Sequence, residues 1–217
     1  MRLIFVRHGL AVDRENYIRM GIGDEHRPLT AEGIRKIQFL SFFLRRRIRD
    51  LDLIVASPFV RTMQTADILA NAYGDLPVRK TETLEPELAP QDFWNWLLGQ
   101  TLLRSRDRLK TEAVNVTILV VGHEPHLTRL ISWLLTDVER PILRLKKGGA
   151  CMLEFTYELT PGHAQLRWLT TPGILPQRKL ARKMTKQKAG TKKTGKKMET
   201  KKKTAKKATR KASQKKK

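Results

Sequence analysis

Residues 1–10 read MRLIFVRHGL, an apolar run that ends abruptly in Arg7, His8 and Gly9. The side chains at positions 3–6 are bulky or β-branched and apolar, which predicts a buried β-strand. A glycine directly after the strand permits a tight turn. Ligands bind at the carboxyl ends of strands in open α/β sheets, so these three residues mark either an ordinary exit to solvent or part of a binding site.

Strand and helix patterns alternate along the chain. Short apolar runs predict strands at 3–7, 52–57, 77–82, 116–122, 149–158 and 164–170. Helical patterns with start and stop signals predict helices after the cap Thr30, from the cap Ser57 with Pro58 at the first helical position, over about 90–109, and from His123. This alternation predicts an α/β fold, a three-layer sandwich with a mainly parallel central sheet flanked by helices and an antiparallel edge.

Positive charge is concentrated near the end of the sequence. Residues 177–217 contain twenty Lys or Arg and one acid, a net charge of +19 out of the total of +23, so residues 1–176 carry only +4. We expect a globular domain over 1–176, long enough to remove roughly 70% of its surface from water. The remaining Lys-rich segment is nearly free of apolar residues and predicts a disordered tail, because it cannot bury enough surface to offset the entropy of ordering.

Several classes of protein are excluded by simple counts. Cys151 is the only cysteine, so neither an intrachain disulfide nor a zinc ribbon is possible, and its apolar surroundings predict a buried side chain. No apolar stretch approaches eighteen residues and the N-terminus lacks the features of a signal peptide, which predicts no membrane partner and a cytoplasmic location. His123 and His126 lack acidic partners at ligand spacing, so we expect neither a metal nor a cofactor.

Basic side chains follow three of the predicted strands. Arg7 and His8 follow the first, Arg61 begins the helix after the second, and His123 follows the run at 116–122. Parallel strands would bring these side chains to one edge of the sheet, where a helix N-terminus adds free N–H groups. Two guanidiniums can form paired hydrogen bonds with phosphoryl oxygens. The arrangement therefore predicts a phosphate pocket.

These residues carry a resemblance to a known family. "RHG" (7–9), "SPFVRTMQTA" (57–66) and "GHEP" (122–125), in this order, resemble the histidine phosphatase superfamily with its phosphoglycerate-mutase-like fold. Within the superfamily, "RPLTAEG" (27–33) and "ELAP" (87–90) are most similar to the SixA-type phosphohistidine phosphatases. The resemblance extends over roughly residues 1–170.

The resemblance implies a role for each of the basic residues. His8 would be the nucleophile that attacks phosphorus and forms a phosphohistidine intermediate, which water then hydrolyses. The positive charge around His8 would keep the imidazole neutral, as attack requires. Arg7, Arg61 and His123 would bind the equatorial phosphoryl oxygens and stabilise the charge that develops there.

The same resemblance implies roles for Gly9 and Ser57. Gly9 would let the backbone come close to the bound phosphoryl group. Ser57 would either cap the helix that follows it or contact the phosphate, and we favour the cap.

A general acid is the least defined part of the predicted site. Superfamily members that act on phosphate esters protonate the leaving oxygen with a carboxylate after the third strand, where this chain has Glu82, Glu85 and Glu87. We select Glu85. The similarity of "ELAP" to the SixA pattern favours instead a site without a dedicated acid, because phosphohistidine is a labile phosphoramidate.

Three functions are consistent with these observations. The first is a phosphatase that removes phosphate from phosphohistidine in proteins. The second is a phosphatase of a small phosphorylated metabolite. The third is a polyanion-binding protein, because the tail at 177–217 would bind DNA, RNA or polyphosphate through charge alone.

Overall fold

The computed structural model of the protein describes residues 1–100 and 116–173. The tail predicted over 177–217 lies outside the described residues, as does the second half of the helix predicted over 90–109. Within the described part of the chain, no helix combines the length and the apolar character needed to cross a membrane.

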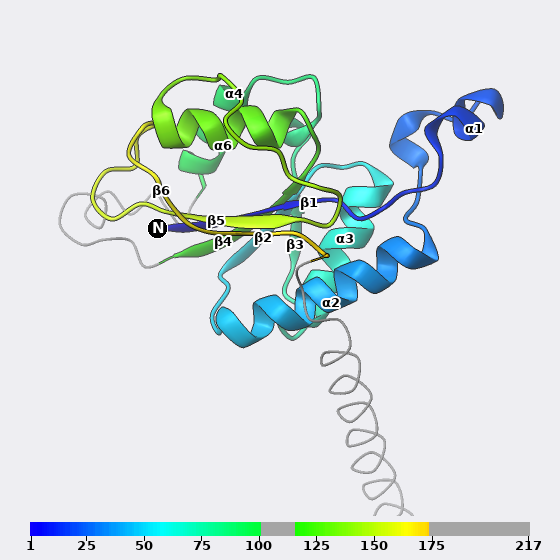
Figure 1. Ribbon diagram of the computed structural model, residues 1–217, viewed down its shortest axis with the longest axis horizontal. Coiled ribbons are helices and arrows are strands. Elements are labelled where there is room, and N and C mark those ends of the chain that lie inside the picture. Colours follow the sequence, from blue (N-terminus) through cyan, green and yellow to red (C-terminus); the bar gives the residue numbers. More distant parts are fainter. Residues whose placement is uncertain (101–115, 174–217) are drawn as a thin grey trace, which may run out of the picture. The chain divides into compact units, whose positions relative to one another are not determined.

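A six-stranded sheet forms the centre of the fold (Figure 1). Its strands are β1 (Arg2–Arg7), β2 (Leu53–Ala56), β3 (Val78–Lys80), β4 (Thr117–Gly122), β5 (Ala150–Glu154) and β6 (Gln165–Thr170). They are arranged in the order β3-β2-β4-β1-β5-β6. The first four strands are mutually parallel, whereas β5 runs antiparallel to β1 and β6 antiparallel to β5. The predicted mainly parallel sheet with an antiparallel edge is confirmed.

Helices cover both faces of this sheet, as a three-layer sandwich requires. The helices are α1 (Arg14–Arg19), α2 (Ala31–Arg47), α3 (Val60–Asn71), α4 (Pro90–Leu98) and α6 (His126–Thr136), with short 3₁₀ turns η1 (Asp24–His26) and η2 (Glu82–Leu84). Figure 1 shows α4 and α6 on one face and α2 and α3 on the other. The unpredicted helix α1 projects from the layers and buries none of its residues.

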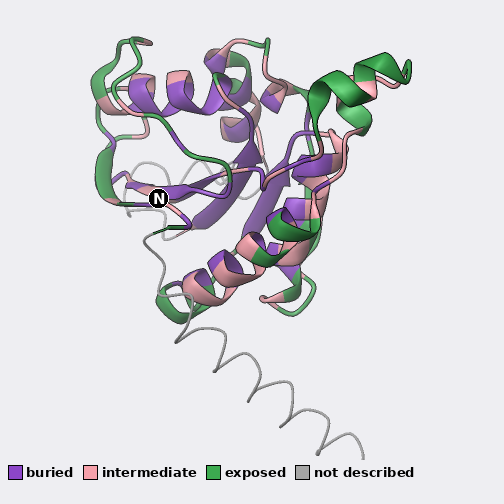
Figure 2. Ribbon diagram, turned by 45° about the vertical axis from the view of Figure 1, so that its right-hand side comes forward, coloured by how far each residue is buried: buried purple, intermediate pink, exposed green. Residues whose placement is uncertain are grey.

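The core lies where the central strands are covered on both faces. Residues 3–6 of β1 and 118–121 of β4 are completely buried, as the continuous purple strands of Figure 2 show. Such strands are apolar along their whole length because neither face contacts water. Phe5 and Val120 pack with Phe93 of α4 in one cluster, and each such side chain contributes about 1.5–3 kcal/mol by leaving water.

Two helix starts differ from their predictions. Helix α3 begins at Val60 with Phe59 at the N-cap, so Ser57 is not the cap and Pro58 is not helical. Helix α6 begins at His126, three residues after the predicted start at His123. A proline disfavours helical backbone at the residue before it, and Pro125 therefore delays the start of α6.

Helix α2 docks closely against the segment that follows β1. Thr30 is its N-cap as predicted, accepting a hydrogen bond from the Gly33 amide at 3.0 Å and donating one to the Leu10 carbonyl at 3.1 Å. A Cβ atom on Gly33 would lie 2.1 Å from that same carbonyl oxygen. Only glycine fits there, and this close contact fixes where the chain passes after His8.

Replacing Gly33 by alanine should therefore destabilise the protein. Alanine improves intrinsic helix propensity by about 1 kcal/mol, but the clash with a backbone atom should outweigh this gain and lower the free energy of unfolding by about 1–3 kcal/mol. Urea unfolding of Gly33→Ala and wild type measures the difference. Arg35→Ala, on an exposed position of the same helix, is the control and should change stability by less than about 0.5 kcal/mol. A stabilised Gly33→Ala variant would contradict the packing argument.

Candidate active site

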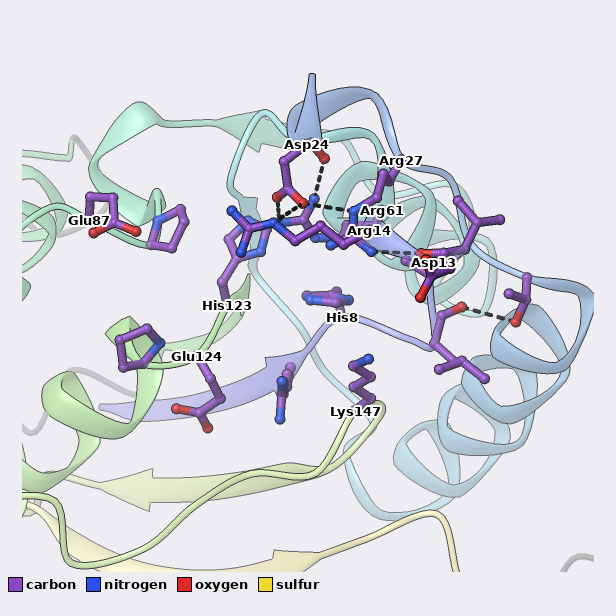
Figure 3. Close-up of a pocket in the computed structure, with 17 residues that line it drawn as sticks. His8, Asp13, Arg14, Asp24, Arg27, Arg61, Glu87, His123, Glu124 and Lys147 are labelled. Atoms are coloured by element: carbon purple, nitrogen blue, oxygen red, sulfur yellow. Dashed lines mark hydrogen bonds and ion pairs between the residues drawn. The ribbon is translucent and has the colours of Figure 1, made fainter. Parts of the chain in front are cut away.

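A pocket of about 560 Å³ lies at the carboxyl ends of β1 and β4 (Figure 3). Its lining comes from the residues after β1, the loop between α1 and α2, the first turn of α3, the loop after η2, and the segment before β5. The predicted residues Arg7, His8, Arg61 and His123 all line it. The parallel strands thus bring together side chains that are far apart in the sequence.

His8 occupies the centre of this group and has only 5% of its surface exposed. Its Nδ1 lies 2.7 Å from the carbonyl oxygen of Gly9. A carbonyl can only accept, so Nδ1 carries the proton and the lone pair of the neutral ring is on Nε2. Burial, opposed by the Gly9 hydrogen bond and assisted by the charges of Arg61, Arg7 and Lys147, lowers the pKa of His8 to about 3. His8 is therefore a neutral imidazole with a free Nε2 at neutral pH.

Three cations surround this imidazole. Arg7 donates from Nη1 to the Leu145 carbonyl at 2.8 Å, and its buried Nε has no partner among the described residues. Arg61 is 3% exposed and lies in the first turn of α3, as predicted. Lys147, on the segment before β5, also lines the pocket, although nothing in the local sequence pattern indicated it. Burial and the neighbouring arginines lower the pKa of Lys147.

His123 lies beside His8, with 5.2 Å between the ring centroids. Ser57 Oγ is 2.9 Å from His123 Nε2, and both residues are buried. The Ser57 hydroxyl therefore fixes the orientation of the His123 ring, which corrects the prediction that Ser57 caps α3. Burial, together with the charge of Arg61, lowers the pKa of His123 to about 2.

Gly9 has a different role from the predicted one. It is not among the residues that line the pocket. A Cβ atom there would lie 2.9 Å from Ile37 Cγ1 and 3.2 Å from Leu29 Cδ2. The missing side chain thus makes room for α2 and its preceding loop, rather than for a bound phosphoryl group. The Gly9 amide also donates to Thr65 Oγ1 of α3 at 3.1 Å.

Asp24, in the loop before α2, also lines the pocket, although no local sequence pattern indicated it. Arg61 donates from Nη1 to the Asp24 carbonyl oxygen at 2.6 Å and from Nη2 to Oδ2 at 2.8 Å. Arg27 and Arg14 approach Oδ1 at 2.8 and 3.3 Å. Burial alone would raise the pKa of Asp24, but the Arg27 hydrogen bond and the three positive charges hold it below its ordinary value. Asp24 is thus an ionised carboxylate held on the guanidinium of Arg61.

The structure places Glu87, and not Glu85, at the pocket. Glu85 ends the turn η2, and the chain reaches the pocket only at the next two residues. Glu124 also lines the pocket, but its Oε1 and Oε2 accept hydrogen bonds from the Leu145 and Thr128 amides. Glu87 is exposed, and Figure 3 shows it beyond His123 as seen from His8.

No group of three or more His, Cys, Asp or Glu side chains that could hold a metal ion occurs within residues 1–100 and 116–173. Metal independence of the chemistry stays a prediction. Cys151 is completely buried, and burial raises its pKa, which agrees with the expected role of a small apolar side chain.

Asp24→Asn should increase the affinity of the pocket for phosphate. The variant removes the carboxylate that competes with an anion for Arg61, and one charge at this distance is worth about tenfold or more in the dissociation constant of inorganic phosphate. Isothermal titration calorimetry measures it. Asp13→Asn, which removes a charge from the same pocket without touching Arg61, is the matched control and should have a smaller effect. Equal effects of the two variants would show that only net charge matters.

Buried histidines should make the fold sensitive to acid. His126 is completely buried and burial lowers its pKa to about 4, whereas an unfolded chain protonates the ring near pH 6.5. The unfolded state therefore binds more protons between these values, and stability falls as the pH is lowered through this range. His126 should contribute up to about 1.4 kcal/mol per pH unit. Urea unfolding at several pH values should give a shallower slope for His126→Gln, and an unchanged slope would contradict this origin.

Comparisons with known proteins find a family model and a relative that this chain resembles. The family model described as histidine phosphatase superfamily (branch 1) matches residues 3–91. An uncharacterised protein of a Picosynechococcus species is 29% identical over 174 residues, which cover 79% of this chain and 97% of the relative.

Solved structures share the fold. The protein histidine phosphatase SixA complexed with tungstate superimposes with a TM-score of 0.63 at 20% identity, covering 80% of this chain and 98% of the other. A mycobacterial glucosyl-3-phosphoglycerate phosphatase with inorganic phosphate gives a TM-score of 0.58 at 18% identity, covering 80% and 99%. By the family model over residues 3–91 and by its fold, the chain is similar to the histidine phosphatase superfamily.

Proposed function

We propose that the protein is a phosphatase that removes the phosphoryl group from phosphohistidine in proteins, through a phosphoenzyme intermediate on His8. The observation that carries the proposal is the state of His8. Its Nδ1 proton is bonded to the Gly9 carbonyl, and its Nε2 lone pair is free in a pocket lined by Arg7 and Arg61.

In the first step the Nε2 lone pair of His8 forms a bond to phosphorus. The bond between phosphorus and the leaving group breaks, and its electron pair goes to the leaving atom. The proton on Nδ1 stays hydrogen-bonded to the Gly9 carbonyl, which stabilises the positive charge that the ring gains on phosphorylation. In the second step water attacks phosphorus, the P–Nε2 bond breaks, and neutral His8 and inorganic phosphate result.

The other side chains of the pocket stabilise the charge that develops on the phosphoryl oxygens during this transfer. Arg7 and Arg61 neutralise the equatorial oxygens of the phosphoryl group, and His123 contributes a ring fixed by Ser57. Arg61 must exchange its contact with Asp24 for the phosphoryl oxygens. Before substrate binds, the guanidinium of Arg61 is thus paired with the carboxylate of Asp24.

The carboxylates around the pocket support a phosphoramidate substrate. Asp24 is held ionised by three arginines, and Glu124 is occupied by two backbone amides, so neither is suited to donate a proton. An alkoxide is a poor leaving group without such a donor. The imidazole of phosphohistidine leaves as a neutral ring when its other nitrogen is protonated, and needs no acid from the protein.

The alternative is a phosphatase of a small phosphate ester. Glu87 favours it, because this exposed carboxylate lines the pocket and forms no hydrogen bond or ion pair with another described residue. The fold is also shared with an enzyme named for a phosphorylated sugar derivative, glucosyl-3-phosphoglycerate phosphatase.

Activity on a phosphohistidine protein and on a panel of phosphate esters tests the proposal. We expect kcat/KM to be highest on the phosphohistidine protein and unaffected by EDTA. His8→Ala should be inactive, and rapid quenching of wild type should trap an acid-labile, base-stable phosphoenzyme that this variant lacks. Arg61→Ala should lower kcat/KM by at least about a hundredfold, or about 3 kcal/mol of transition-state stabilisation.

Glu87→Gln separates the two substrate classes. It should leave kcat on phosphohistidine nearly unchanged, since no acid is required there. If wild type hydrolyses esters better than phosphohistidine, and Glu87→Gln loses about a hundredfold in kcat on esters, the alternative function replaces the first. Normal turnover by His8→Ala would overturn both.

For residues 177–217 we propose sequence-independent contact with polyanions, on the basis of their net charge of +19 alone.

A further inference from the structure

Four arginines gather where helix α2 ends: Arg45, Arg46, Arg47 and Arg49, here termed the α2 arginine cluster. All four are exposed. Some arginines elsewhere in the fold pair with acids, as Arg61 does with Asp24 and Arg129 with Glu139. None of the four forms an ion pair with a carboxylate among the described residues. The cluster therefore presents uncompensated positive charge on a body that is nearly neutral overall.

Aromatic rings hold three of these guanidiniums in place. Arg45 lies over the ring of Tyr73 at 5.4 Å, and Arg46 lies over Phe42 at 5.8 Å. Arg47 lies over Phe43 at 3.9 Å, and Trp168 of β6 packs edge-on against that ring at 6.3 Å. A guanidinium stacked on a ring keeps its charge and its N–H donors while losing rotamer freedom. The entropy cost of ordering it on a ligand is correspondingly smaller.

Stabilisation of the helix end does not require so many charges. Basic residues in the last turn of a helix contribute about 0.3–1 kcal/mol through the helix dipole, and the effect falls off within that turn. Arg45 Nη1 also donates to the Arg49 carbonyl at 3.1 Å, which satisfies one group at this end. Arg49 itself lies beyond the last helical residue, Arg47. The excess charge points to a ligand.

The directions of the side chains restrict the ligand. Successive residues of a helix are rotated by about 100°, so Arg45, Arg46 and Arg47 diverge. Arg45 lies over Tyr73, just past α3, whereas Arg47 lies over Phe43, whose ring packs against Trp168 of β6. Guanidiniums arranged in this way cannot converge on one phosphate, but they can each contact a different phosphate along a chain. The apolar neighbour Ile48 is buried, so the cluster has no apolar side chain to insert into a membrane.

We propose that the α2 arginine cluster binds the phosphodiester backbone of nucleic acid without reading its sequence. Each of the three rings is half-buried and has a guanidinium over one face, so base stacking is not the basis of binding. Thr30, the N-cap of helix α2, lines the pocket. The 17 residues of the helix place the cluster at its opposite end, about 25 Å away (Figure 1). Binding at the cluster would hold the protein on a polyanion and leave the catalytic pocket open.

Binding of full-length protein to a fluorescein-labelled 30-base-pair duplex of arbitrary sequence, measured by anisotropy at several salt concentrations, tests this proposal. The variant replaces all four cluster arginines by glutamine. The matched control replaces four other exposed basic residues, Arg19, Arg35, Lys80 and Arg140, by glutamine, so that both proteins lose the same charge. Hydrolysis of a small phosphate ester should be equal to wild type in both variants, which shows that the pocket is intact.

Each phosphate contact contributes about 0.9 to the slope of log affinity against log salt. We expect the cluster variant to lose about three units of slope and at least tenfold in affinity at low salt, and the control variant to lose less than one unit. Replacing the four arginines by lysine should restore part of the affinity, because charge returns without the planar stacking. The same comparison is made with long-chain polyphosphate and with anionic vesicles. Equal losses of duplex affinity in the cluster and control variants would overturn the proposal, as would a loss seen only with polyphosphate or only with vesicles.

Discussion

The hydrogen bond between His8 Nδ1 and the Gly9 carbonyl is the interaction on which the site depends. It places the proton of a neutral imidazole on the nitrogen that faces the backbone and leaves the lone pair on Nε2. The bond needs the chain to turn sharply after β1, and this turn exists because Gly9 and Gly33 have no side chains where α2 packs against it. The close packing of one helix thus determines the chemical state of His8, the proposed nucleophile.

Charge around that imidazole follows from the same geometry. Positive groups from β1, α3 and the segment before β5 meet at the pocket, and burial with these charges keeps His8 neutral. Asp24 limits the cost of bringing them together, because its carboxylate contacts Arg61, Arg27 and Arg14. A phosphoryl group carries the same sign of charge as this carboxylate, so Asp24 neutralises Arg61 as a phosphoryl group would.

The α2 arginine cluster, Arg45, Arg46, Arg47 and Arg49, shows the opposite arrangement. Its guanidiniums are ordered by aromatic rings, and no carboxylate among the described residues neutralises them. Stacking stabilises the position of a guanidinium while leaving its charge available, whereas an ion pair would consume that charge. The arginine charge is therefore neutralised by a carboxylate at the pocket, whereas at the C-terminal end of α2 no described carboxylate neutralises it.

The sequence by itself determined the layered α/β fold and the four basic residues Arg7, His8, Arg61 and His123, because strands, helices and the residues that follow strands are local patterns. Only the tertiary structure decided the contacts between distant residues. It paired Asp24 with Arg61 across 37 positions and Ser57 with His123 across 66, and it brought Glu87 rather than Glu85 to the pocket. No local pattern records such contacts, since they arise when the sheet closes and separate loops meet at its edge.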